Sequence, residues 1–289
     1  MNYRHAYHAG GFADVVKHAV LCRVLVHLRQ KPAAFRVIDT HAGSGIYDLT
    51  ATEAGKTGEW REGIGRLLSA PLDAEVGLLL APYLDAIAAC NRPERLTTYP
   101  GSPALVRSLL RRQDRLIACE LEPRAAAALA RNLHGDVRVK TIPIDGWTAL
   151  SAYVPPKERR GVVLVDPPFE QPDDFTRLAQ GLENAHRKWP TGIYLLWYPI
   201  KEPAEVLALT RHLARSGIAK ILRVELDVGP SVAPTADAAK LHGTGLIVVN
   251  PPWRLETELS RLLPALTTVL GRNGKGAAKL EWLAGEAAK

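Results

Sequence analysis

The chain has 289 residues, which is long enough for one large α/β domain or for a domain that carries an insertion. Its 47% hydrophobic and 23% charged residues are ordinary for a globular protein. No run approaches about 18 apolar residues, so we expect no membrane span and no membrane partner. The 37 lysines and arginines against 30 aspartates and glutamates give a formal charge of +7, which favours a polyanionic partner without identifying one.

The first residues have neither the apolar region nor the small-residue cleavage site of a secretory signal, so we expect a cytoplasmic protein. Cys22, Cys90 and Cys119 are far apart in the sequence, and none belongs to a C-x-x-C pair. This spacing predicts neither a disulfide framework nor a structural zinc site. We therefore expect reduced, mostly buried thiols and no metal.

The first part of the chain predicts a helix, a strand and an insertion. Apolar residues recur on one face of 14–28, which indicates an amphipathic helix whose Lys17 lies off the apolar face. The β-rich run 35–39 predicts a strand, which a glycine turn follows at 40–45. From 46 to 98 the periodic stretches are helical and no strand is indicated, so we expect a helical insertion.

The rest of the chain alternates between helices and strands. Ser102 suits the N-cap of a helix and Pro103 suits its first position. The alternation implies parallel strands with right-handed crossovers, so the predicted fold class is α/β, with a doubly wound Rossmann-like sheet. Only 271–289 has the composition of a tail. The predicted strands are 115–119, 137–144, 161–165, 193–198, 221–227 and 245–249, and the predicted helices are 122–133, 172–188 and 203–216.

Acidic residues close four of the predicted strands, at Asp39, Glu120, Asp145 and Asp166. In an open doubly wound sheet the ligand lies outside the carboxyl ends of the strands, so these residues belong together. Glu120 can accept two hydrogen bonds from a ribose diol, although a solvated loop glutamate is the alternative. Asp145 can accept from an adenine amino group while Gly146 leaves room for the ring, although Asp-Gly is also a common turn.

The segment Asp166-Pro167-Pro168-Phe169 is the sharpest signal of chemistry. The amine of an adenine has its lone pair delocalised into the ring, so methyl transfer needs acceptors that hold both N–H bonds and favour a pyramidal nitrogen. The Asp166 carboxylate and the Pro167 carbonyl can do this, because two consecutive prolines stiffen the backbone and lack N–H donors. Phe169 offers a face on which an extruded base can stack. The alternative is an ordinary Pro-Pro strand terminator.

The order of these motifs resembles that of class I S-adenosylmethionine methyltransferases of the N6-adenine type. Over almost the whole chain the sequence is similar to the RlmJ family of bacterial large-subunit ribosomal RNA adenine-N6 methyltransferases. The matching segments are Tyr3-Arg4-His5, His8-Ala9-Gly10, Ala13-Asp14-Val15-x-Lys17-His18, Asp39-Thr40-His41-Ala42-Gly43-x-Gly45, Tyr99-Pro100-Gly101-Ser102-Pro103, Leu196-Trp197-Tyr198-Pro199 and Asn250-Pro251-Pro252-Trp253, together with Glu120, Asp145 and the segment at Asp166.

The resemblance implies that the cofactor is S-adenosylmethionine and that the substrate is 23S rRNA, either protein-free or in an early assembly intermediate, methylated at the N6 of an adenine by a monomer. It implies that Asp166 is the catalytic acceptor and that Tyr3 engages the RNA. It also implies a methyltransferase domain at 1–45 and 99–289 with an inserted subdomain at 46–98. The residues that it places at the cofactor are His18, His41, Ser102, Glu120, Asp145, Gly146 and Asp166.

The residues themselves support His18, His41 and Phe169 to different degrees. His18 lies on the first predicted helix, where a histidine is more often a core or surface residue than a ligand contact. His41 lies inside the glycine turn, where an imidazole can hydrogen-bond the cofactor's carboxylate. Phe169 is a departure, because the family commonly carries tyrosine there; stacking survives, but any hydroxyl contact is lost.

A second tetrapeptide of the same kind, Asn250-Pro251-Pro252-Trp253, follows the last predicted strand. In the methyltransferase version of the fold the seventh strand runs antiparallel, so this segment should lie at the opposite edge from the cofactor, and we expect Asn250 to be structural. Two other functions remain open. The target can be DNA, although the insertion is small for a sequence-reading domain, or the chain can be a non-catalytic RNA-binding module, against which the intact Asp166 argues.

Overall fold

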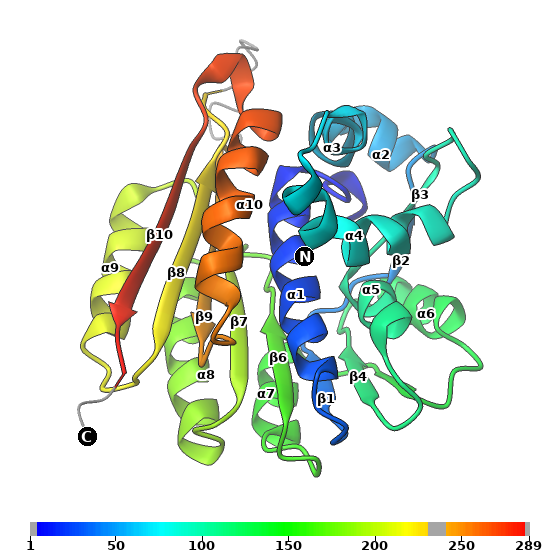
Figure 1. The fold of residues 1–289 in the computed structure, drawn as a ribbon. Coiled ribbons are helices and arrows are strands. Elements are labelled where there is room, and N and C mark those ends of the chain that lie inside the picture. The colour runs from blue at the N-terminus through cyan, green and yellow to red at the C-terminus, as the bar shows by residue number, and fades with distance from the viewer. Residues whose placement is uncertain (1–4, 231–240, 287–289) are drawn as a thin grey trace.

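A mixed sheet of eight strands runs through the protein in a computed structural model that describes residues 5–230 and 241–286 (Figure 1). The strand order is β10-β8-β9-β7-β6-β1-β4-β5. Tyr3 lies outside the described residues. The strands are β1 (Arg36–Asp39), β4 (Arg115–Cys119), β5 (Val139–Ile142), β6 (Gly161–Val165), β7 (Ile193–Ile200), β8 (Ile221–Asp227), β9 (Gly243–Val249) and β10 (Ala277–Ala284).

Five neighbouring strands, β5, β4, β1, β6 and β7, pair in parallel, as the alternation of helices and strands predicted. Central strands of a parallel sheet are covered on both faces, and β6 is accordingly buried at every residue. β9 lies between β7 and β8 and is antiparallel to both. The predicted α/β class is therefore confirmed, and so is the reversed direction of the strand before Asn250.

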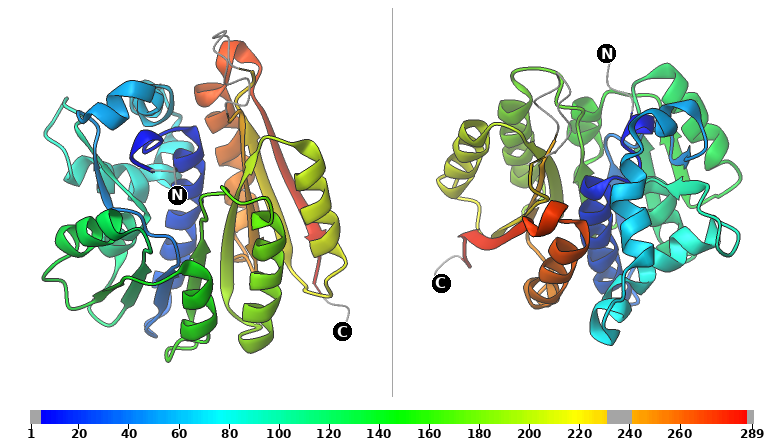
Figure 2. Two further views of the ribbon diagram at one scale, coloured as in Figure 1. Left: turned by 180° about the vertical axis from the view of Figure 1, so that it is seen from behind. Right: turned by 90° about the horizontal axis from the view of Figure 1, so that it is seen from above.

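Helices cover both faces of the sheet (Figure 1; Figure 2, right). Residues of α1, α4, α5 and α10 share one apolar core with one face, and residues of α7, α8 and α9 share a second core with the other. Among the described residues, no helix is long and apolar enough to cross a membrane. The helices are α1 (Phe12–Arg29), α2 (Thr52–Thr57), α3 (Arg66–Ser69), α4 (Ala74–Ala89), α5 (Ser102–Leu109), α6 (Pro123–Asn132), α7 (Gly146–Tyr153), α8 (Asp174–Lys188), α9 (Pro203–Ala214) and α10 (Leu255–Leu270).

The first helix, α1, is not amphipathic in its surroundings, contrary to the prediction. Its side chains are buried on nearly all sides, because the sheet lies on one side of it and α4, α5 and α10 pack around the others. Lys17, expected off the apolar face, is only 3% exposed. A buried lysine needs a partner, and that partner is in the site described below.

The predicted helical insertion contains strands as well as helices. β2 (Ile46–Asp48) and β3 (Thr98–Pro100) pair antiparallel at the two ends of 46–98, so the expectation of no strand there was wrong. Between them lie α2, a π-helical turn at Arg61–Gly65, α3 and α4. α4 packs on α1 and α5 and places Tyr83 in the main core, so the insertion shares the core of the sheet.

The C-terminal stretch is also more ordered than its composition predicted. β10 occupies eight residues of 271–289, the stretch expected to be a tail, and pairs antiparallel with β8 at the edge of the sheet. In β10, Lys279 and Glu281 alternate with apolar residues over only a few positions, which is a weak strand pattern. The strand is stabilised by its pairing with β8 and by the ion pair between Arg223 and Glu281. The sheet thereby gains a strand that the sequence pattern did not indicate.

Candidate active site

A cavity of about 470 Å³ opens at the carboxyl ends of the parallel strands. Its walls come from α1, from the turn after β1, from the start of α5 and from the segments after β4, β5 and β6. The structure brings together here all seven residues that were expected at the cofactor. They are His18, His41, Ser102, Glu120, Asp145, Gly146 and Asp166.

The glycine turn after β1 is held by the carboxylate of Glu120. Its Oε2 accepts a hydrogen bond from the Gly43 N–H at 2.8 Å, and its Oε1 accepts from the Glu122 N–H at 2.8 Å. Gly43 has φ +58°, and a Cβ there would lie 2.1 Å from the Tyr47 hydroxyl, so only glycine fits. Burial raises the pKa of Glu120 even though these N–H groups oppose the shift. The carboxylate and the turn therefore form one rigid wall.

Ser102 does not cap its helix, contrary to the prediction. Gly101 occupies the N-cap of α5, and the Ser102 hydroxyl instead donates to Oδ2 of Asp39 at 2.7 Å. Asp39 is fully buried, and its Oδ1 has no hydrogen bond to any described residue. Burial raises the pKa of Asp39 to about 7, with a further contribution from the nearby charge of Asp166. The bond between Ser102 and Asp39 joins α5 to the end of β1.

His41 packs against the start of α7, where Asp145 and Gly146 lie. The Asp145 carboxylate caps α7 by accepting from the Thr148 N–H at 2.8 Å. A Cβ on Gly146 would lie 2.4 Å from Nε2 of His41, so glycine is required for the approach of the imidazole. Burial lowers the pKa of His41 to about 4, so its imidazole is neutral at pH 7. The neutral ring can donate one hydrogen bond into the cavity.

His18 is buried at the base of the cavity. Its Nδ1 lies 2.7 Å from the hydroxyl of Tyr99, which in turn lies 2.8 Å from the hydroxyl of Tyr83. Burial lowers the pKa of His18 to about 3, and the positive charge of Lys17 adds to the shift. A neutral imidazole on the first helix is thus fixed by the β3 and α4 elements of the insertion.

Asp166 belongs to a buried chain of charges that the sequence reasoning missed. The Lys17 ammonium lies 2.5 Å from Oδ2 of Asp166 and 2.9 Å from Oδ1 of Asp14, whose Oδ2 is 3.0 Å from Nε2 of His5. Burial alone would lower the pKa of Lys17, but the two carboxylates outweigh it and hold that pKa above its usual value. The signal that could have found this chain is the Asp14–Lys17 pair, spaced by three residues in an otherwise apolar helix.

Phe169 faces inward in this structure and does not line the cavity. Its φ is +50°, and its ring lies 4.8 Å from that of Phe175 and 5.6 Å from that of Trp197, centroid to centroid. The neighbouring Pro168 and Glu170 do line the cavity. Other lining residues that the sequence reasoning missed are Tyr47, Arg124, Trp147 and Arg177.

Asn250 is structural, as expected from the direction of β9. Its Nδ2 donates to the carbonyl oxygens of Pro190 and Gly192 at 2.8 Å each, and its φ of +52° lies in the left-handed region that asparagine tolerates. The second tetrapeptide therefore lies at the amino ends of the parallel strands, away from Asp166. Within the described ranges, no group of three or more His, Cys, Asp or Glu residues could hold a metal ion.

Comparison with known proteins shows similarity along nearly the whole chain. A family model described as ribosomal RNA large subunit methyltransferase D, RlmJ, matches residues 32–284. The chain is 38% identical over 287 residues to the ribosomal RNA large subunit methyltransferase J of Escherichia coli, with 99% of this chain and 100% of that protein covered. The protein of the same name from Haemophilus influenzae has the same identity and coverage. A solved structure of a Legionella pneumophila protein is 34% identical, with a TM-score of 0.85 over 95% of this chain and 98% of that one.

Proposed function

Because this chain belongs to the RlmJ family of ribosomal RNA large-subunit methyltransferases and is therefore an S-adenosylmethionine-dependent rRNA methyltransferase, we propose that it methylates the N6 amine of an adenine in 23S rRNA. The observation that carries this choice of atom is the position of Asp166. It follows β6 directly, lines the cavity, is fixed by Lys17 and precedes two prolines. This arrangement supplies two acceptors for the two N–H bonds of an exocyclic amine.

The cavity residues fit S-adenosylmethionine, which supplies an electrophilic methyl group when bound. Gly146 leaves the space beside His41 that a Cβ would fill, and Glu120 offers carboxylate oxygens to a ribose diol. Asp145 uses Oδ2 to cap α7, and its Oδ1, which bonds to no described residue, can accept from an adenine amino group. His41, as a neutral imidazole, can donate to a carboxylate. We assign His18 and Ser102 to the same site as walls that hold Tyr99 and Asp39 in place.

Asp166 and the backbone that follows it would hold the target amine. Since Lys17 occupies Oδ2 of Asp166, the other oxygen of this carboxylate remains for one N–H, and the carbonyl of Pro167 can accept the second. Two acceptors at one nitrogen favour the pyramidal geometry in which its lone pair is available. Asp166 or solvent then takes the departing proton. Lys17 acts in this scheme as a positioning residue.

We further propose that the substrate is protein-free or early-assembly 23S rRNA, methylated in the cytoplasm by a monomer. Tyr3 is proposed to engage this RNA, although it lies outside the described residues. Phe169 is proposed to stack on the extruded base, which requires its ring to leave Phe175 and Trp197 or the base to reach the ring where it lies.

The test is the Asp166→Ala variant with a radiolabelled methyl donor. We expect cofactor affinity within a few fold of wild type and no methyl transfer to ribosomal RNA, because the amine loses its acceptor while Lys17 keeps Asp14 as a partner. Asp173→Ala is the matched control, since Asp173 is an exposed carboxylate on the same segment. Near-normal turnover by Asp166→Ala would overturn the assignment. Label in DNA but not in RNA, or in RNA at an atom other than adenine N6, would overturn the proposed substrate.

A further inference from the structure

The two edges of the parallel sheet carry opposite charge. We define the amino edge as the five segments that run from the end of a helix to the start of a parallel strand, and the carboxyl edge as the five segments that follow the same strands. The amino edge holds eleven lysines and arginines and three carboxylates, a formal charge of +8; the carboxyl edge holds one lysine and nine carboxylates, a formal charge of −8. The amino edge is 29–36, 109–115, 132–139, 153–161 and 188–193, and the carboxyl edge is 39–46, 119–123, 142–146, 165–174 and 200–203.

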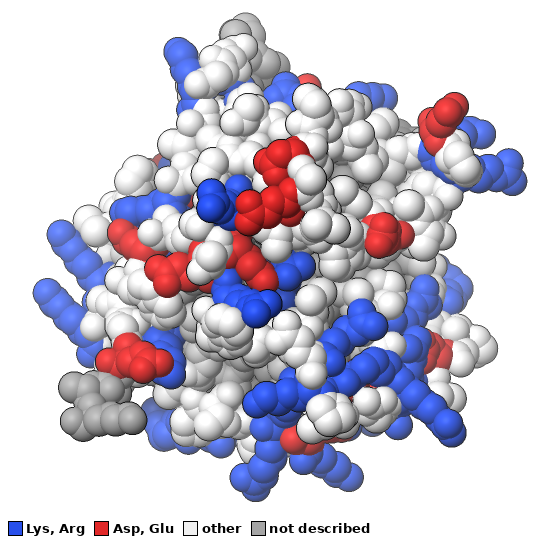
Figure 3. Space-filling view, viewed as in Figure 1, with Lys and Arg blue, Asp and Glu red and all other residues white. Residues whose placement is uncertain are grey.

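The cations of the amino edge lie together on the surface. Figure 3 shows lysine and arginine side chains gathered over the lower right of the molecule, below the end of α1 and the start of β4 in Figure 1. The positive charges also affect the pKa of His27 on α1. Burial lowers the pKa of His27, and the charges of Arg160, Lys31 and Arg254 lower it further. A surface with this much uncompensated positive charge favours a polyanionic partner.

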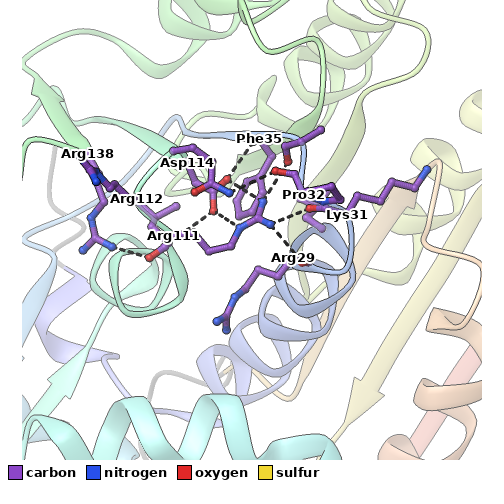
Figure 4. A network of polar contacts seen from close by, with 12 residues as sticks. Arg29, Lys31, Pro32, Phe35, Arg111, Arg112, Asp114 and Arg138 are labelled. Atoms are coloured by element: carbon purple, nitrogen blue, oxygen red, sulfur yellow. Dashed lines mark hydrogen bonds and ion pairs between the residues drawn. The ribbon is translucent and has the colours of Figure 1, made fainter.

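Some of these cations hold the segments of the amino edge together through hydrogen bonds. The Arg111 guanidinium donates to the carbonyl oxygens of Arg29, Lys31 and Ala33 and to the carboxylate of Asp114, so it ties the segment before β1 to the segment before β4 (Figure 4). Arg160 donates to the same Ala33 carbonyl. These arginines are structural, because their donors are already used within the protein.

Other cations of the amino edge make no hydrogen bond or ion pair through their side chains with any described residue. In Figure 4 the side chains of Arg29 and Lys31 point away from the network that Arg111 builds. Their donors are therefore available to a ligand. The exposed residues of this kind are Arg29, Lys31, Arg112, Lys157 and Arg159.

An exposed aromatic side chain lies at the same edge. Because β9 is antiparallel, the Asn250–Trp253 tetrapeptide follows its strand at the amino edge, where Asn250 bonds to Pro190 and Gly192. Trp253 is 73% exposed, and the Arg254 guanidinium lies 4.5 Å from its ring centroid. An open indole beside unpaired cations suits a nucleic acid, whose bases stack while its phosphates pair, better than an acidic protein surface.

Exposed cations also connect the two edges. α6 runs from the carboxyl edge to the amino edge, with Arg124 at the cavity and Arg131 two turns further on, and both are exposed. Lys140 on the outer strand β5 is exposed as well, on the face of the sheet opposite to α6. β6, which separates Arg160 from Asp166, has five residues and spans about 17 Å. An RNA longer than the target loop can therefore follow this flank from one edge to the other.

We infer that the amino edge, with Trp253, is a second RNA-binding surface that holds the phosphate backbone flanking the target adenine, and this inference rests on the proposed function. The carboxyl edge supplies acceptors for chemistry and repels phosphates. The amino edge supplies the affinity that the acidic carboxyl edge lacks. RNA that extends beyond the target loop should therefore bind more tightly than the loop alone. Its binding constant should also depend more strongly on the salt concentration.

The experiment compares wild type and four variants on two RNAs. One RNA is a short hairpin that presents the target adenine, and the other carries the same hairpin with a long flanking duplex. The charge variant is Lys31→Gln, Arg112→Gln, Lys157→Gln and Arg159→Gln combined. Its control removes four exposed cations that belong to neither edge, at Arg92, Arg95, Arg211 and Lys275. The aromatic variant is Trp253→Ala, with Trp282→Ala, an exposed tryptophan on β10, as its control.

We expect the charge variant to bind the long RNA roughly ten- to a hundred-fold more weakly and to lower the slope of log K against log salt by roughly 3, as the loss of about four phosphate contacts predicts. Trp253→Ala should weaken the same complex about five-fold or more. Binding and methylation of the short hairpin should be unchanged. Equal slopes for the charge variant, its control and wild type would overturn the inference. Failure of wild type to methylate either RNA would instead overturn the proposed function.

Discussion

The amino edge and the carboxyl edge are built on the same five parallel strands, yet their formal charges are +8 and −8. At the carboxyl edge the acceptors at the cavity are held by other side chains, as Asp39 is by Ser102 and Asp166 is by Lys17. At the amino edge several cations point into solvent, among them Lys31 and Arg112. Chemistry on an amine needs acceptors, whereas a phosphate backbone needs cations, and one surface cannot favour both. The net charge of +7 conceals this division.

The largest effect should come from Lys17→Met at the carboxyl edge. Removal of the ammonium leaves Asp14 and Asp166 as buried carboxylates without their partner, so Asp166 should shift. We expect turnover on RNA to fall by about a hundred-fold or more and the free energy of unfolding to fall by roughly 3–5 kcal/mol. Steady-state methylation and urea unfolding measure the two effects.

A second variant separates misplacement of Asp166 from loss of stability. Lys17→Met with Asp14→Asn should recover part of the stability, because one buried charge is gone, but not the turnover. Full turnover in either protein would show that the ion pair has no positioning role.

At the amino edge, adjacent arginines should behave differently. Arg111→Gln breaks the contacts to three carbonyl oxygens and leaves the buried Asp114 without its guanidinium, so we expect the free energy of unfolding to fall by about 2–3 kcal/mol with turnover on a short hairpin unchanged. Arg112→Gln, which breaks no such contact, should change stability by less than about 0.5 kcal/mol. Thermal unfolding of both variants checks this, and equal destabilisation would contradict the division into structural and solvent-facing cations.

The smallest effect, at most about 1.4 kcal/mol over any one pH unit, is a pH dependence set by Asp39. Burial raises its pKa in the folded protein to about 7, whereas the unfolded pKa is about 3.9. The folded state therefore binds the extra proton between these values, and the stability that Asp39 contributes falls as the pH rises through this window.

Asp39→Asn removes that titration while it keeps an oxygen for Ser102. Relative to wild type, the variant should become more stable as the pH rises from about 4 to about 7, by up to about 1.4 kcal/mol for each pH unit, and the difference should level off above that range. In the control, Asp48→Asn, hydrogen bonds from Thr50 lower the carboxyl pKa, so its titration lies below this interval and its difference from wild type should stay flat. A flat difference for Asp39→Asn as well would contradict the raised pKa.

The sequence predicted the parallel strands and their acidic ends because both are local signals. The run at 161–165 is apolar throughout and ends at Asp166, and nothing in the tertiary structure overrides it. The weaker run at 137–144 was predicted too long: β5 covers only Val139–Ile142, and Val137 is exposed. The resemblance, together with the rule that ligands bind at strand ends, predicted which residues would line one cavity, and the seven residues proposed for the cofactor do line it.

What the sequence could not predict depends on distant contacts. A lysine in a helix is ordinarily exposed, and the sequence does not indicate that Asp166, 149 residues away, pairs with the buried Lys17. β10 is a strand because β8 offers it an edge. Ser102 matched the pattern of a helix N-cap, but its hydroxyl donates to the buried carboxylate of Asp39 instead. The sequence also did not indicate the left-handed backbone of Phe169, whose ring lies against Phe175 and Trp197.

The packing of α10 on α1 determines when the active site can fold during translation. The helix that carries Lys17 and His18 emerges first, yet α10, near the end of the chain, completes its surroundings through the bidentate pair of Arg23 and Glu258, 235 residues apart. Such long-range closure makes folding slow. In a chain that stops before α10, one side of α1 should remain exposed. The ion pairs that Lys17 makes with Asp14 and Asp166 should then not be held in place. Complete translation would then be a condition for the first methyl transfer, which arrested nascent chains of increasing length can measure.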